Sequence, residues 1–403
     1  MRDPRIKVLV TFGTRPEAIK LAPVVKAFAD HPRFEMDVCV TAQHRSMLDQ
    51  VLDTFHIKPR YDLDLMRPAQ TLPDITARII TGVCDVVRDY RPDWVIVQGD
   101  TTTALAAGLA AFYEQVSVAH VEAGLRTDEK YSPFPEEINR RLVSCIADLH
   151  FAPSLRAKAN LLRENCLESQ VHVSGNTIVD ALLWVVARLG SDAPLKRALD
   201  ERFSFLDPTR RMILITGHRR ESFGRPFENM CHALVDIVER SPDVEILYPV
   251  HLNPNVQAPV KAILGGASPA LSRRIHMIEP VDYLTFVYLM TRSHFIITDS
   301  GGVQEEAPSL GKPVLVTREN TERPEAVEAG TARLIGTDRA RIVAEAMRLL
   351  NDDAHRRSMS GGRNPYGDGY ACARIVERLS EAAGGPRCVL EEFAGLTREL
   401  API

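Results

Sequence analysis

A strand, a glycine-rich turn and the start of a helix are predicted by the stretch Ile296-Ile297-Thr298-Asp299-Ser300-Gly301-Gly302-Val303-Gln304-Glu305-Glu306. Residues 294–298 are mostly apolar and β-branched, which is typical of a strand buried in a parallel sheet. We expect the helix to span residues 303–310 and to end at Gly311. A strand that turns directly into a helix is the repeating unit of a doubly wound α/β fold.

The glycine-rich turn also predicts an anion site. The first N–H groups of a helix lack partners within the helix and carry partial positive charge, and glycine lets a ligand approach the backbone. We therefore expect Ser300, Gly301 and Gly302 to hold a diphosphate, and Glu305 or Glu306 to bind ribose hydroxyls. The structural alternatives are packing for the turn and helix capping for the glutamates, which are predicted to lie in the first helical turn.

The same alternation of strand and helix runs through the whole chain. Strands are predicted at 6–12, 34–40, 94–98, 116–120, 149–151, 212–216, 244–249, 275–278, 295–298 and 313–316. Helices are predicted at 16–30, 45–55, 71–89, 136–147, 155–164, 226–240, 338–350 and 370–382. The pattern pauses near 175–189, and a polar stretch follows to 209, where we place the linker between two domains.

Two Rossmann-like doubly wound domains are therefore expected, one over residues 1–180 and one over 181–365. A chain of 403 residues is also too long for a single hydrophobic core. Two such domains imply a cleft between them, with the C-terminal ends of the strands facing the cleft.

The composition indicates an ordinary globular protein, with 45% hydrophobic and 25% charged residues. The net charge of −4 comes without any block of like charge, so no nucleic-acid or membrane surface is indicated. No apolar run is long enough to cross a bilayer. The seven scattered cysteines contain no Cys-x-x-Cys, which predicts reduced thiols in the cytoplasm.

Polar side chains follow almost every predicted strand, and the first of these groups contains Arg15 and Lys20. A cation at a helix start is unfavourable for the helix dipole, so Arg15 requires another explanation. It either forms a surface ion pair with Glu17 or binds a phosphate or carboxylate ligand. We favour ligand binding, with Lys20 projecting one helical turn further on.

Three carboxylates follow predicted strands or begin a helix in the first half of the chain: Asp100, Glu122 and Glu136. Each has a structural alternative, namely capping for Asp100 and Glu136, and a buried ion pair with Arg126 or Arg140 for Glu122. If the three carboxylates share one site, repulsion separates their pKa values into acid and base roles.

In the second half, His218 follows a strand and a glycine, at an end expected to face the phosphate site. The sequence has no His-x-x-x-His or cysteine cluster, no Gly-x-x-x-x-Gly-Lys-Ser/Thr and no Gly-x-Gly-x-x-Gly. A metal site, a P-loop kinase and a conventional NAD enzyme are therefore not indicated, and no cofactor is expected.

Motifs along the chain resemble the non-hydrolysing UDP-N-acetylglucosamine 2-epimerases of bacteria. They include Gly13-Thr14-Arg15-Pro16-Glu17, Gly99-Asp100-Thr101-Thr102-Thr103, His120-Val121-Glu122-Ala123-Gly124-Leu125-Arg126, Gly217-His218-Arg219-Arg220-Glu221, the stretch at 298–313, and Thr321-Glu322-Arg323-Pro324-Glu325. The resemblance implies a GT-B arrangement of the two domains, with the segment 366–403 crossing back to the first. It also implies interconversion of UDP-GlcNAc and UDP-ManNAc without NAD or metal, through loss and re-addition of UDP.

The resemblance further implies roles for individual residues. Asp100, Glu122, Glu136 and His218 match catalytic positions, and substrate-binding positions are matched by Arg15, Lys20, Phe286, Ser300, Gly301, Gly302, Glu306 and Arg323. A second, activating UDP-GlcNAc site would include Gln43, His44, Arg67 and Gln70. A homodimer in the cytoplasm is expected, with the product supplying surface polysaccharide synthesis.

The alternatives are a 2-epimerase acting on another UDP-linked N-acetyl amino sugar, and a hydrolysing epimerase that releases free ManNAc. A GT-B glycosyltransferase is disfavoured because no acceptor-site motif is visible. A non-enzymatic sugar-nucleotide sensor is disfavoured by the intact set of Asp100, Glu122, Glu136 and His218.

Overall fold

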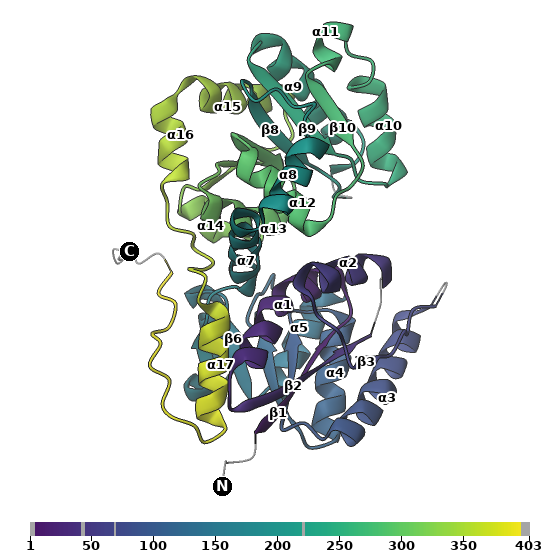
Figure 1. The fold of residues 1–403 in the computed structure, drawn as a ribbon, viewed down its shortest axis with the longest axis vertical. Helices are drawn as coiled ribbons and strands as arrows, with labels where there is room; N and C mark the ends of the chain where they lie inside the picture. The colour runs from purple at the N-terminus through teal and green to yellow at the C-terminus, as the bar shows by residue number, and fades with distance from the viewer. Residues whose placement is uncertain (1–4, 42–44, 68–69, 220–221, 396–403) are drawn as a thin grey trace. The chain divides into compact units, whose positions relative to one another are not determined.

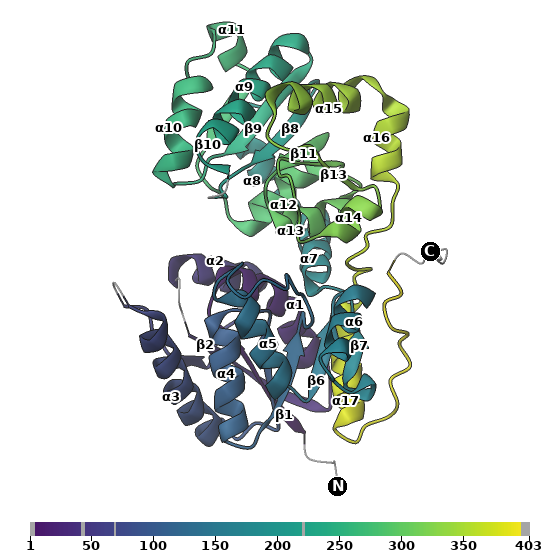
Figure 2. The ribbon, with the colours of Figure 1, turned by 180° about the vertical axis from the view of Figure 1, so that it is seen from behind.

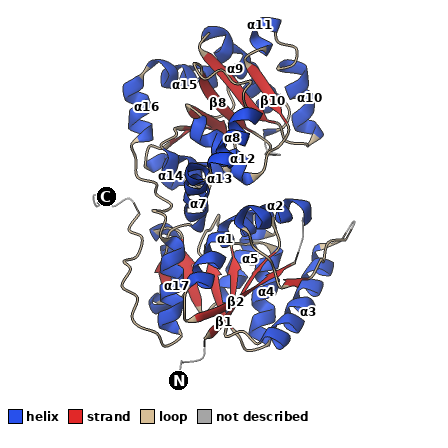
Figure 3. Cartoon of the chain, viewed as in Figure 1, coloured by secondary structure: helices blue, strands red, loops and turns tan. Residues whose placement is uncertain are grey.

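The computed structural model describes residues 5–41, 45–67, 70–219 and 222–395. The chain divides into two compact units. Unit 1 consists of Met1–Trp184 and Tyr366–Ile403, and unit 2 consists of Val185–Pro365. Each unit contains one parallel sheet covered by helices, drawn in red and blue in Figure 3.

The sheet of unit 1 has seven strands in the order β3-β2-β1-β4-β5-β6-β7, all parallel. The strands are β1 (Ile6–Phe12), β2 (Phe34–Val40), β3 (Tyr61–Asp62), β4 (Trp94–Gln98), β5 (Ser117–Val121), β6 (Leu149–Ala152) and β7 (Val171–Val173). This order reverses between β1 and β4, as in a Rossmann fold. The two strands are in register there, with Val8 beside Trp94 and Val10 beside Ile96.

Helices cover both faces of this sheet. They are α1 (Arg15–Asp30), α2 (Arg45–Phe55), α3 (Leu72–Tyr90), α4 (Thr102–Tyr113), α5 (Glu136–Ile146), α6 (Leu155–Arg163), α7 (Thr177–Ser191) and α17 (Ala371–Ala382), with the 3₁₀ turn η1 (Glu168–Gln170). Helices α1 and α17 pack together in front of the sheet in Figure 1. Figure 2 shows α4 and α5 on the opposite face, where α3 and α4 bury a core with Val95, Val97 and Val118.

The sheet of unit 2 has six parallel strands in the order β10-β9-β8-β11-β12-β13. They are β8 (Arg211–Thr216), β9 (Val244–Pro249), β10 (Ile275–Ile278), β11 (Phe295–Thr298), β12 (Val314–Val316) and β13 (Ala332–Leu334). The order reverses between β8 and β11, so unit 2 repeats the Rossmann topology.

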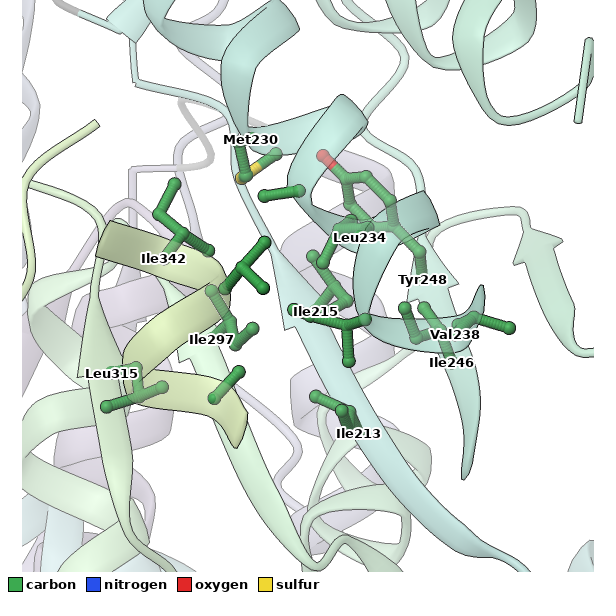
Figure 4. Close-up of a cluster of buried hydrophobic side chains, with 14 of the residues drawn as sticks. Ile213, Ile215, Met230, Leu234, Val238, Ile246, Tyr248, Ile297, Leu315 and Ile342 are labelled. Atoms are coloured by element: carbon green, nitrogen blue, oxygen red, sulfur yellow. The ribbon is translucent and has the colours of Figure 1, made fainter. Parts of the chain in front are cut away.

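The helices of unit 2 are α8 (Ala193–Arg202), α9 (Arg225–Arg240), α10 (Pro254–Ile263), α11 (Pro269–Ser272), α12 (Tyr283–Arg292), α13 (Gly301–Glu306), α14 (Pro324–Glu328), α15 (Arg339–Asn351) and α16 (Asp353–Ser360), with the 3₁₀ turn η3 (Ala307–Leu310). Figure 4 shows the core between the sheet and α9 and α15. Met230 and Leu234 of α9 and Ile342 of α15 pack there on Ile213, Ile215 and Ile297. Burial of these apolar side chains from both faces explains why the strands are continuous hydrophobic runs.

The predicted class, two Rossmann-like doubly wound α/β domains, is confirmed by these two sheets. Three short strands were not predicted: β3, β7 and β13, all at or near sheet edges. Most of the stretch expected to be a linker, from 175 to 209, is instead folded into α7 and α8, which together reach Arg202. The division between the units falls inside α7, at Trp184.

The first residue of the helix after the glycine-rich turn was predicted wrongly. Helix α13 begins at Gly301 rather than Val303, and it changes to a 3₁₀ turn at Ala307. Pro308, which has no N–H to donate, lies in that 3₁₀ turn. Gly311 closes the segment in the left-handed conformation, with φ of 63°.

Candidate active site

The loops after β1 and β4 lie at the switch point of unit 1, where strand order reverses. The loops after β8 and β11 occupy the same position in unit 2. In doubly wound sheets, ligands bind outside the carboxyl ends of the strands at this point, because neighbouring loops diverge there. Predicted site residues follow all four of these strands: Arg15, Asp100, His218 and Ser300.

In unit 1, Glu17 ties the two switch-point loops together. Its Oε2 accepts the backbone N–H groups of Gly13 at 3.1 Å and Thr14 at 2.8 Å, and its Oε1 accepts the Thr101 hydroxyl at 2.7 Å. Burial raises the pKa of Glu17, and these hydrogen bonds oppose the shift. Since its carboxylate is committed to the two loops, the predicted alternative of a surface ion pair between Glu17 and Arg15 is not favoured. Arg15 is half-buried at the start of α1.

Glu122 follows β5 and is buried in a polar cluster. Its Oε1 lies 2.5 Å from Nζ of Lys20 and accepts an amide N–H of Asn176 at 3.0 Å. Its Oε2 accepts a hydrogen bond from the Gln98 side chain. The predicted alternative partners of Glu122 are engaged elsewhere, since Arg126 binds Glu164 and Arg140 binds Asp100 and Glu137.

The backbone at Glu122 is unusual, with a positive φ of 61°. Non-glycine residues rarely adopt this left-handed conformation, which costs free energy and is often found at functional sites. Gly99, which follows the neighbouring strand β4, also has a positive φ, of 67°. A Cβ at Gly99 would lie 3.5 Å from Oε2 of Glu122, so the glycine leaves room beside the carboxylate.

Asp100 has a different environment. Its Oδ2 lies 2.6 Å from a guanidinium nitrogen of Arg140, and its backbone carbonyl accepts a hydrogen bond from Asn139 at 2.9 Å. Burial raises the pKa of Asp100; Arg140 opposes this, while the nearby charges of Glu122 and Glu136 add to it. Glu122 and Glu136 are therefore close enough to Asp100 to influence its charge.

Glu136 begins α5 and carries a buried carboxylate oxygen, Oε2, without a hydrogen-bond partner. It lines a cavity of about 350 Å³ within unit 1. The cavity also meets the starts of α1, α3 and α4 at Thr14, Leu72 and Thr102. A buried carboxylate oxygen without a hydrogen-bond partner, on a residue that lines a cavity, makes Glu136 a candidate proton acceptor.

In unit 2, Asp299 ties the two switch-point loops together. Its Oδ2 accepts the backbone N–H groups of His218 and Arg219, each at 2.8 Å. Its Oδ1 lies 3.7 Å from Nδ1 of His218. The imidazole ring of His218 stacks on that of His251, with centroids 5.3 Å apart and planes 16° apart.

Arg219 reaches over the glycine-rich turn. One of its guanidinium nitrogens would lie 3.5 Å from a Cβ at Gly301, and another binds Oε1 of Glu322 at 3.1 Å. Although burial raises the pKa of Glu322, its pairing with Arg318 and Arg219 holds the pKa at about 2. The turn is thus flanked by cations as well as by the N–H groups of Gly301 and Gly302 in the first turn of α13.

Glu305 and Glu306 were predicted to lie in the first turn of this helix, which is wrong because α13 begins at Gly301. The two side chains have separate partners. Glu306 accepts a hydrogen bond from the hydroxyl of Tyr283 at 2.8 Å, and Glu305 pairs with Arg323. Tyr283 begins α12, which carries the half-buried Phe286 near its N-terminus. Ser300, Glu306, Phe286 and Arg323 are thereby linked through α12 and α13 within unit 2.

Of the residues predicted for an activating site, the structure describes Arg67 and Gln70, which contact each other. Gln43 and His44 lie outside the described residues. The backbone N–H of Arg67 donates to Oε1 of Gln70 at 3.1 Å, and Arg78 donates to the same oxygen at 2.6 Å. Gln70 also lines the 350 Å³ cavity that Glu136 faces.

Some residues that contact the predicted catalytic side chains were not predicted as part of the site, among them Gln98, Arg140, Asn176 and Asp299. Glu17, which holds the two loops of unit 1 together, was not predicted either. Glu17 and Asp299 lie within recognised motifs, but their sequence positions do not indicate which atoms they contact. Asn176 is distant in sequence from Glu122, so the chain pattern contains no signal for that contact.

The part of the chain that the structure describes has neither a metal-binding cluster nor a membrane-spanning helix. No group of three or more histidine, cysteine, aspartate or glutamate side chains there is arranged to hold a metal ion. No helix among those residues combines the length and apolar character needed to cross a membrane. All seven cysteines are free thiols.

Comparisons with known proteins agree on one family. The family model described as UDP-N-acetylglucosamine 2-epimerase matches residues 26–380. The chain is 56% identical to the UDP-N-acetylglucosamine 2-epimerase of Escherichia coli K12, over 93% of this chain and 98% of that protein. Identity to the Salmonella typhimurium protein of the same name is also 56%, with the same coverage.

A solved structure gives the same result. The UDP-GlcNAc 2-epimerase from Neisseria meningitidis, bound to UDP-GlcNAc, matches with a TM-score of 0.86 and 48% identity, over 93% of this chain and 100% of that chain. The chain therefore belongs to the UDP-N-acetylglucosamine 2-epimerase family.

Proposed function

We propose that this protein is a non-hydrolysing UDP-N-acetylglucosamine 2-epimerase, which interconverts UDP-GlcNAc and UDP-ManNAc. In the forward direction, a base removes the proton from C2 of the sugar. The bond between C1 and the diphosphate oxygen then breaks, and UDP leaves with the bonding electrons. The product of this step is 2-acetamidoglucal, with a double bond between C1 and C2. UDP adds back to C1 while C2 receives a proton on the opposite face.

The observation that carries the proposal is the cluster of Asp100, Glu122 and Glu136 at the carboxyl end of one sheet. Removal and return of a proton at C2 need one acid and one base. The three carboxylates differ in their partners, which is how one site keeps an acid and a base at the same pH. Glu122 is paired with Lys20, Asp100 with Arg140, and Glu136 has a buried oxygen without a hydrogen-bond partner.

For the leaving UDP, unit 2 offers donors and cations. His218 and Arg219 flank the turn at Ser300, Gly301 and Gly302, which presents the first N–H groups of α13. Developing negative charge on a diphosphate is stabilised by such preorganised donors. We propose that Glu306 binds the ribose, that Phe286 lies beside the uracil, and that Arg323 binds the nucleotide. The relative from Neisseria meningitidis is named as bound to UDP-GlcNAc, which supports this substrate.

The test is NMR spectroscopy of the purified protein with UDP-GlcNAc in deuterated water. We expect UDP-ManNAc to appear and deuterium to enter C2 of both sugars, because the C2 proton is exchanged in each turnover. Free ManNAc together with UDP would instead identify a hydrolysing enzyme. Turnover without deuterium at C2 would rule out proton removal at that carbon.

A second candidate is a 2-epimerase for another UDP-linked N-acetyl amino sugar. It uses the same nucleotide and the same carboxylates, so only substituents at C4 to C6 distinguish it. Comparing kcat/KM for UDP-GlcNAc and for analogues altered at those carbons separates the two candidates.

We also propose a cytoplasmic homodimer that UDP-GlcNAc activates at a second site, and a product used for surface polysaccharide. The position of Gln70 on the 350 Å³ cavity of unit 1 supports an additional ligand there. Sigmoidal dependence of rate on UDP-GlcNAc that becomes hyperbolic in Gln70→Ala tests the activating site. Sedimentation of the protein at micromolar concentration tests the dimer.

A further inference from the structure

We propose that Asp299 is a positioning residue for His218, holding the Nδ1–H of the imidazole so that Nε2 is the atom offered to the substrate diphosphate. Asp299 has no role in the reaction proposed above. The inference rests on the proposed function only for what Nε2 does to UDP. The arrangement of the two side chains is a property of unit 2 alone.

The backbone contacts place Asp299 next to His218. Asp299 is 1% exposed, and its Oδ2 accepts both the His218 and the Arg219 N–H groups at 2.8 Å. Two successive N–H groups that donate to one carboxylate oxygen hold the loop after β8 against the end of β11. This contact explains why the backbone of His218 is positioned, but it uses only one of the two carboxylate oxygens.

The second oxygen, Oδ1, carries the inference. Among the described residues, it is buried without a hydrogen-bond partner, and it lies 3.7 Å from Nδ1 of His218. A buried carboxylate oxygen without a donor is costly, so a nearby imidazole N–H is the expected partner. The distance is somewhat too long for a hydrogen bond, and a small rotation of the exposed imidazole would close it.

Glu17 provides a comparison within the same chain. It ties the corresponding loops of unit 1, and both of its oxygens accept hydrogen bonds from those loops. A carboxylate can therefore hold two switch-point loops together with hydrogen bonds to both of its oxygens. The oxygen that Asp299 leaves over faces an imidazole, which is the geometry of a carboxylate that orients a histidine.

The surroundings of the ring favour the same orientation. His251, which follows β9, stacks on His218 and limits its tilt. Nδ1 of His251 accepts the N–H of Asn253 at 3.1 Å, so the proton of a neutral His251 is on Nε2. Burial lowers the pKa of His251, and the neighbouring His218 lowers it further.

The other polar groups around the ring already have partners. Arg219 is paired with Glu322, and the hydroxyl of Tyr248 donates to the carbonyl of Gly217 at 3.0 Å. Asp299 is therefore the carboxylate that faces His218 among the described residues of β8, β9 and β11. With Nδ1–H directed at Asp299, the other nitrogen lies at the exposed edge of a ring whose side chain is 46% exposed.

This arrangement gives Nε2 a defined task in the proposed reaction. In the UDP complex the ring takes a second proton from solvent, so that both nitrogens are donors. As UDP leaves, Nε2–H donates to an oxygen of the departing diphosphate, while Nδ1–H faces Asp299, whose carboxylate stabilises the protonated ring. When UDP adds back, the same hydrogen bond is broken. A histidine free to rotate would offer either nitrogen and would lose part of this stabilisation.

The experiment uses Asp299→Asn, which separates the two contacts of this side chain. The amide oxygen of asparagine can take the place of Oδ2 and keep both backbone hydrogen bonds. The amide NH₂ then takes the place of Oδ1 and faces Nδ1 with a donor instead of an acceptor. The substitution therefore retains the tie between the loops and disfavours a proton on Nδ1.

The first readout is independent of catalysis. In ¹⁵N-histidine-labelled protein without ligand, the ring nitrogens of His218 report which one carries the proton, and His218→Gln assigns the signals. We expect Nδ1–H in the unsubstituted protein and Nε2–H in Asp299→Asn. A ring with a proton on Nε2 and none on Nδ1 in the unsubstituted protein would overturn the proposal, and this readout does not depend on the epimerase activity.

The second readout is kinetic and uses His218→Ala as the background. We expect Asp299→Asn to lower kcat, by no more than the roughly 10²–10⁴-fold expected for removing an acid–base group, with little change in KM. In the His218→Ala background, the same substitution should change kcat less than twofold, because it acts through the imidazole.

Two outcomes would contradict the inference. An equal loss of kcat in both backgrounds would assign Asp299 a purely structural role, as would a loss of thermal stability that accounts for the whole effect. If Asp299→Asn does not fold, the tautomer of His218 in the unsubstituted protein still decides the question.

Discussion

Glu122 and Asp100 follow neighbouring strands but have different partners, which is the basis for giving them different chemical roles. Glu122 is in contact with a cation and two amides, from Lys20, Gln98 and Asn176. Asp100 contacts Arg140, and burial raises its pKa. Each carboxylate thus lies beside a cation, which favours its charged form. They differ in their other partners, since Glu122 also accepts hydrogen bonds from two side-chain amides, and on this difference we expect them to serve different steps of proton transfer.

We expect Glu122→Gln and Asp100→Asn each to lower kcat by roughly 10²–10⁴-fold, since each removes a proton-transfer group. UDP affinity measured by calorimetry should stay unchanged, because the proposed UDP contacts are in unit 2. The matched control is Glu129→Gln, an exposed carboxylate of unit 1. Near-normal turnover in either variant would remove that residue from proton transfer.

His120 is a second residue whose environment has a measurable consequence. It is fully buried in β5, where its Nε2 donates to the carbonyl of Gly99 at 2.7 Å. Burial lowers its pKa from 6.5 to about 3. The folded protein thus holds His120 neutral, whereas the unfolded chain takes up a proton below about pH 6.5. The stabilisation from the neutral ring is present above that pH and is lost as the pH falls towards 3.

We therefore expect the free energy of unfolding to fall between pH 7 and pH 5 by about 2 kcal/mol more in the unsubstituted protein than in His120→Gln. Urea unfolding at several pH values measures this difference. His56→Gln replaces an exposed histidine and serves as the control. Parallel pH dependence in all three proteins would show that His120 is not held neutral.

At the scale of elements, the entry into α1 depends on one glycine. A Cβ at Gly13 would collide with the hydroxyls of Thr41 and Thr103, which bond to each other at 3.0 Å across the sheet edge. Because Gly13 has no side chain, the loop after β1 can lie against Thr41, which follows β2, and against Thr103, at the start of α4. The loop is then held by Glu17, so that Arg15 is presented at the switch point.

Gly13→Ala should destabilise the protein by about 1–3 kcal/mol through overpacking. It should also lower kcat, because the loop that carries Arg15 must move. Gly190→Ala is the control, since an added Cβ on α7 has nothing within 4 Å. That change should be neutral or stabilise by up to about 1 kcal/mol, because glycine is a poor helix former. Chemical unfolding measures the stability of both variants. If Gly13→Ala were as stable as Gly190→Ala, the added Cβ would not collide with Thr41 and Thr103.

At the scale of the whole molecule, unit 1 is assembled from two distant segments of the chain. Asp180 of α7 accepts the N–H groups of Ala371 and Cys372 at 3.3 and 2.9 Å, at the start of α17. The N–H of Asn176 donates to the carbonyl of Tyr366 at 2.6 Å, and that of Phe393 donates to Val173 at 2.8 Å. Asn176 also binds Glu122, so the return of the chain is connected to the candidate active site.

We expect Asp180→Ala to lower the free energy of unfolding by about 1–3 kcal/mol, since two N–H groups lose a buried acceptor. Amide hydrogen exchange at Ala371 and Cys372 should quicken more than exchange in β8 and β9 of unit 2. Asp85→Ala, an exposed change on α3, is the control. Unchanged protection at those two amides would mean that α17 is held by its apolar face alone.

Most of the fold could be predicted from the sequence because buried parallel strands are continuous apolar runs, whose ends are marked by glycine and polar residues. The strands β1, β2, β4, β9, β10 and β11 were predicted with the bounds that the structure has. The short strands β3, β7 and β13 have two or three residues each, too few for a periodic pattern. They form because a neighbouring strand supplies hydrogen bonds, which is a tertiary effect.

The sequence by itself determined the family, the fold class and which polar residues follow the strands, since these depend on local pattern and on motifs. Tertiary structure alone decided the partners: Lys20 and Asn176 for Glu122, Arg140 for Asp100, and Asp299 for His218. The partners in each pair lie far apart along the chain, and they meet only where parallel strands bring their ends to one edge. The reactivity of a carboxylate or an imidazole depends on those neighbours through burial and charge, so it is set by the folded chain.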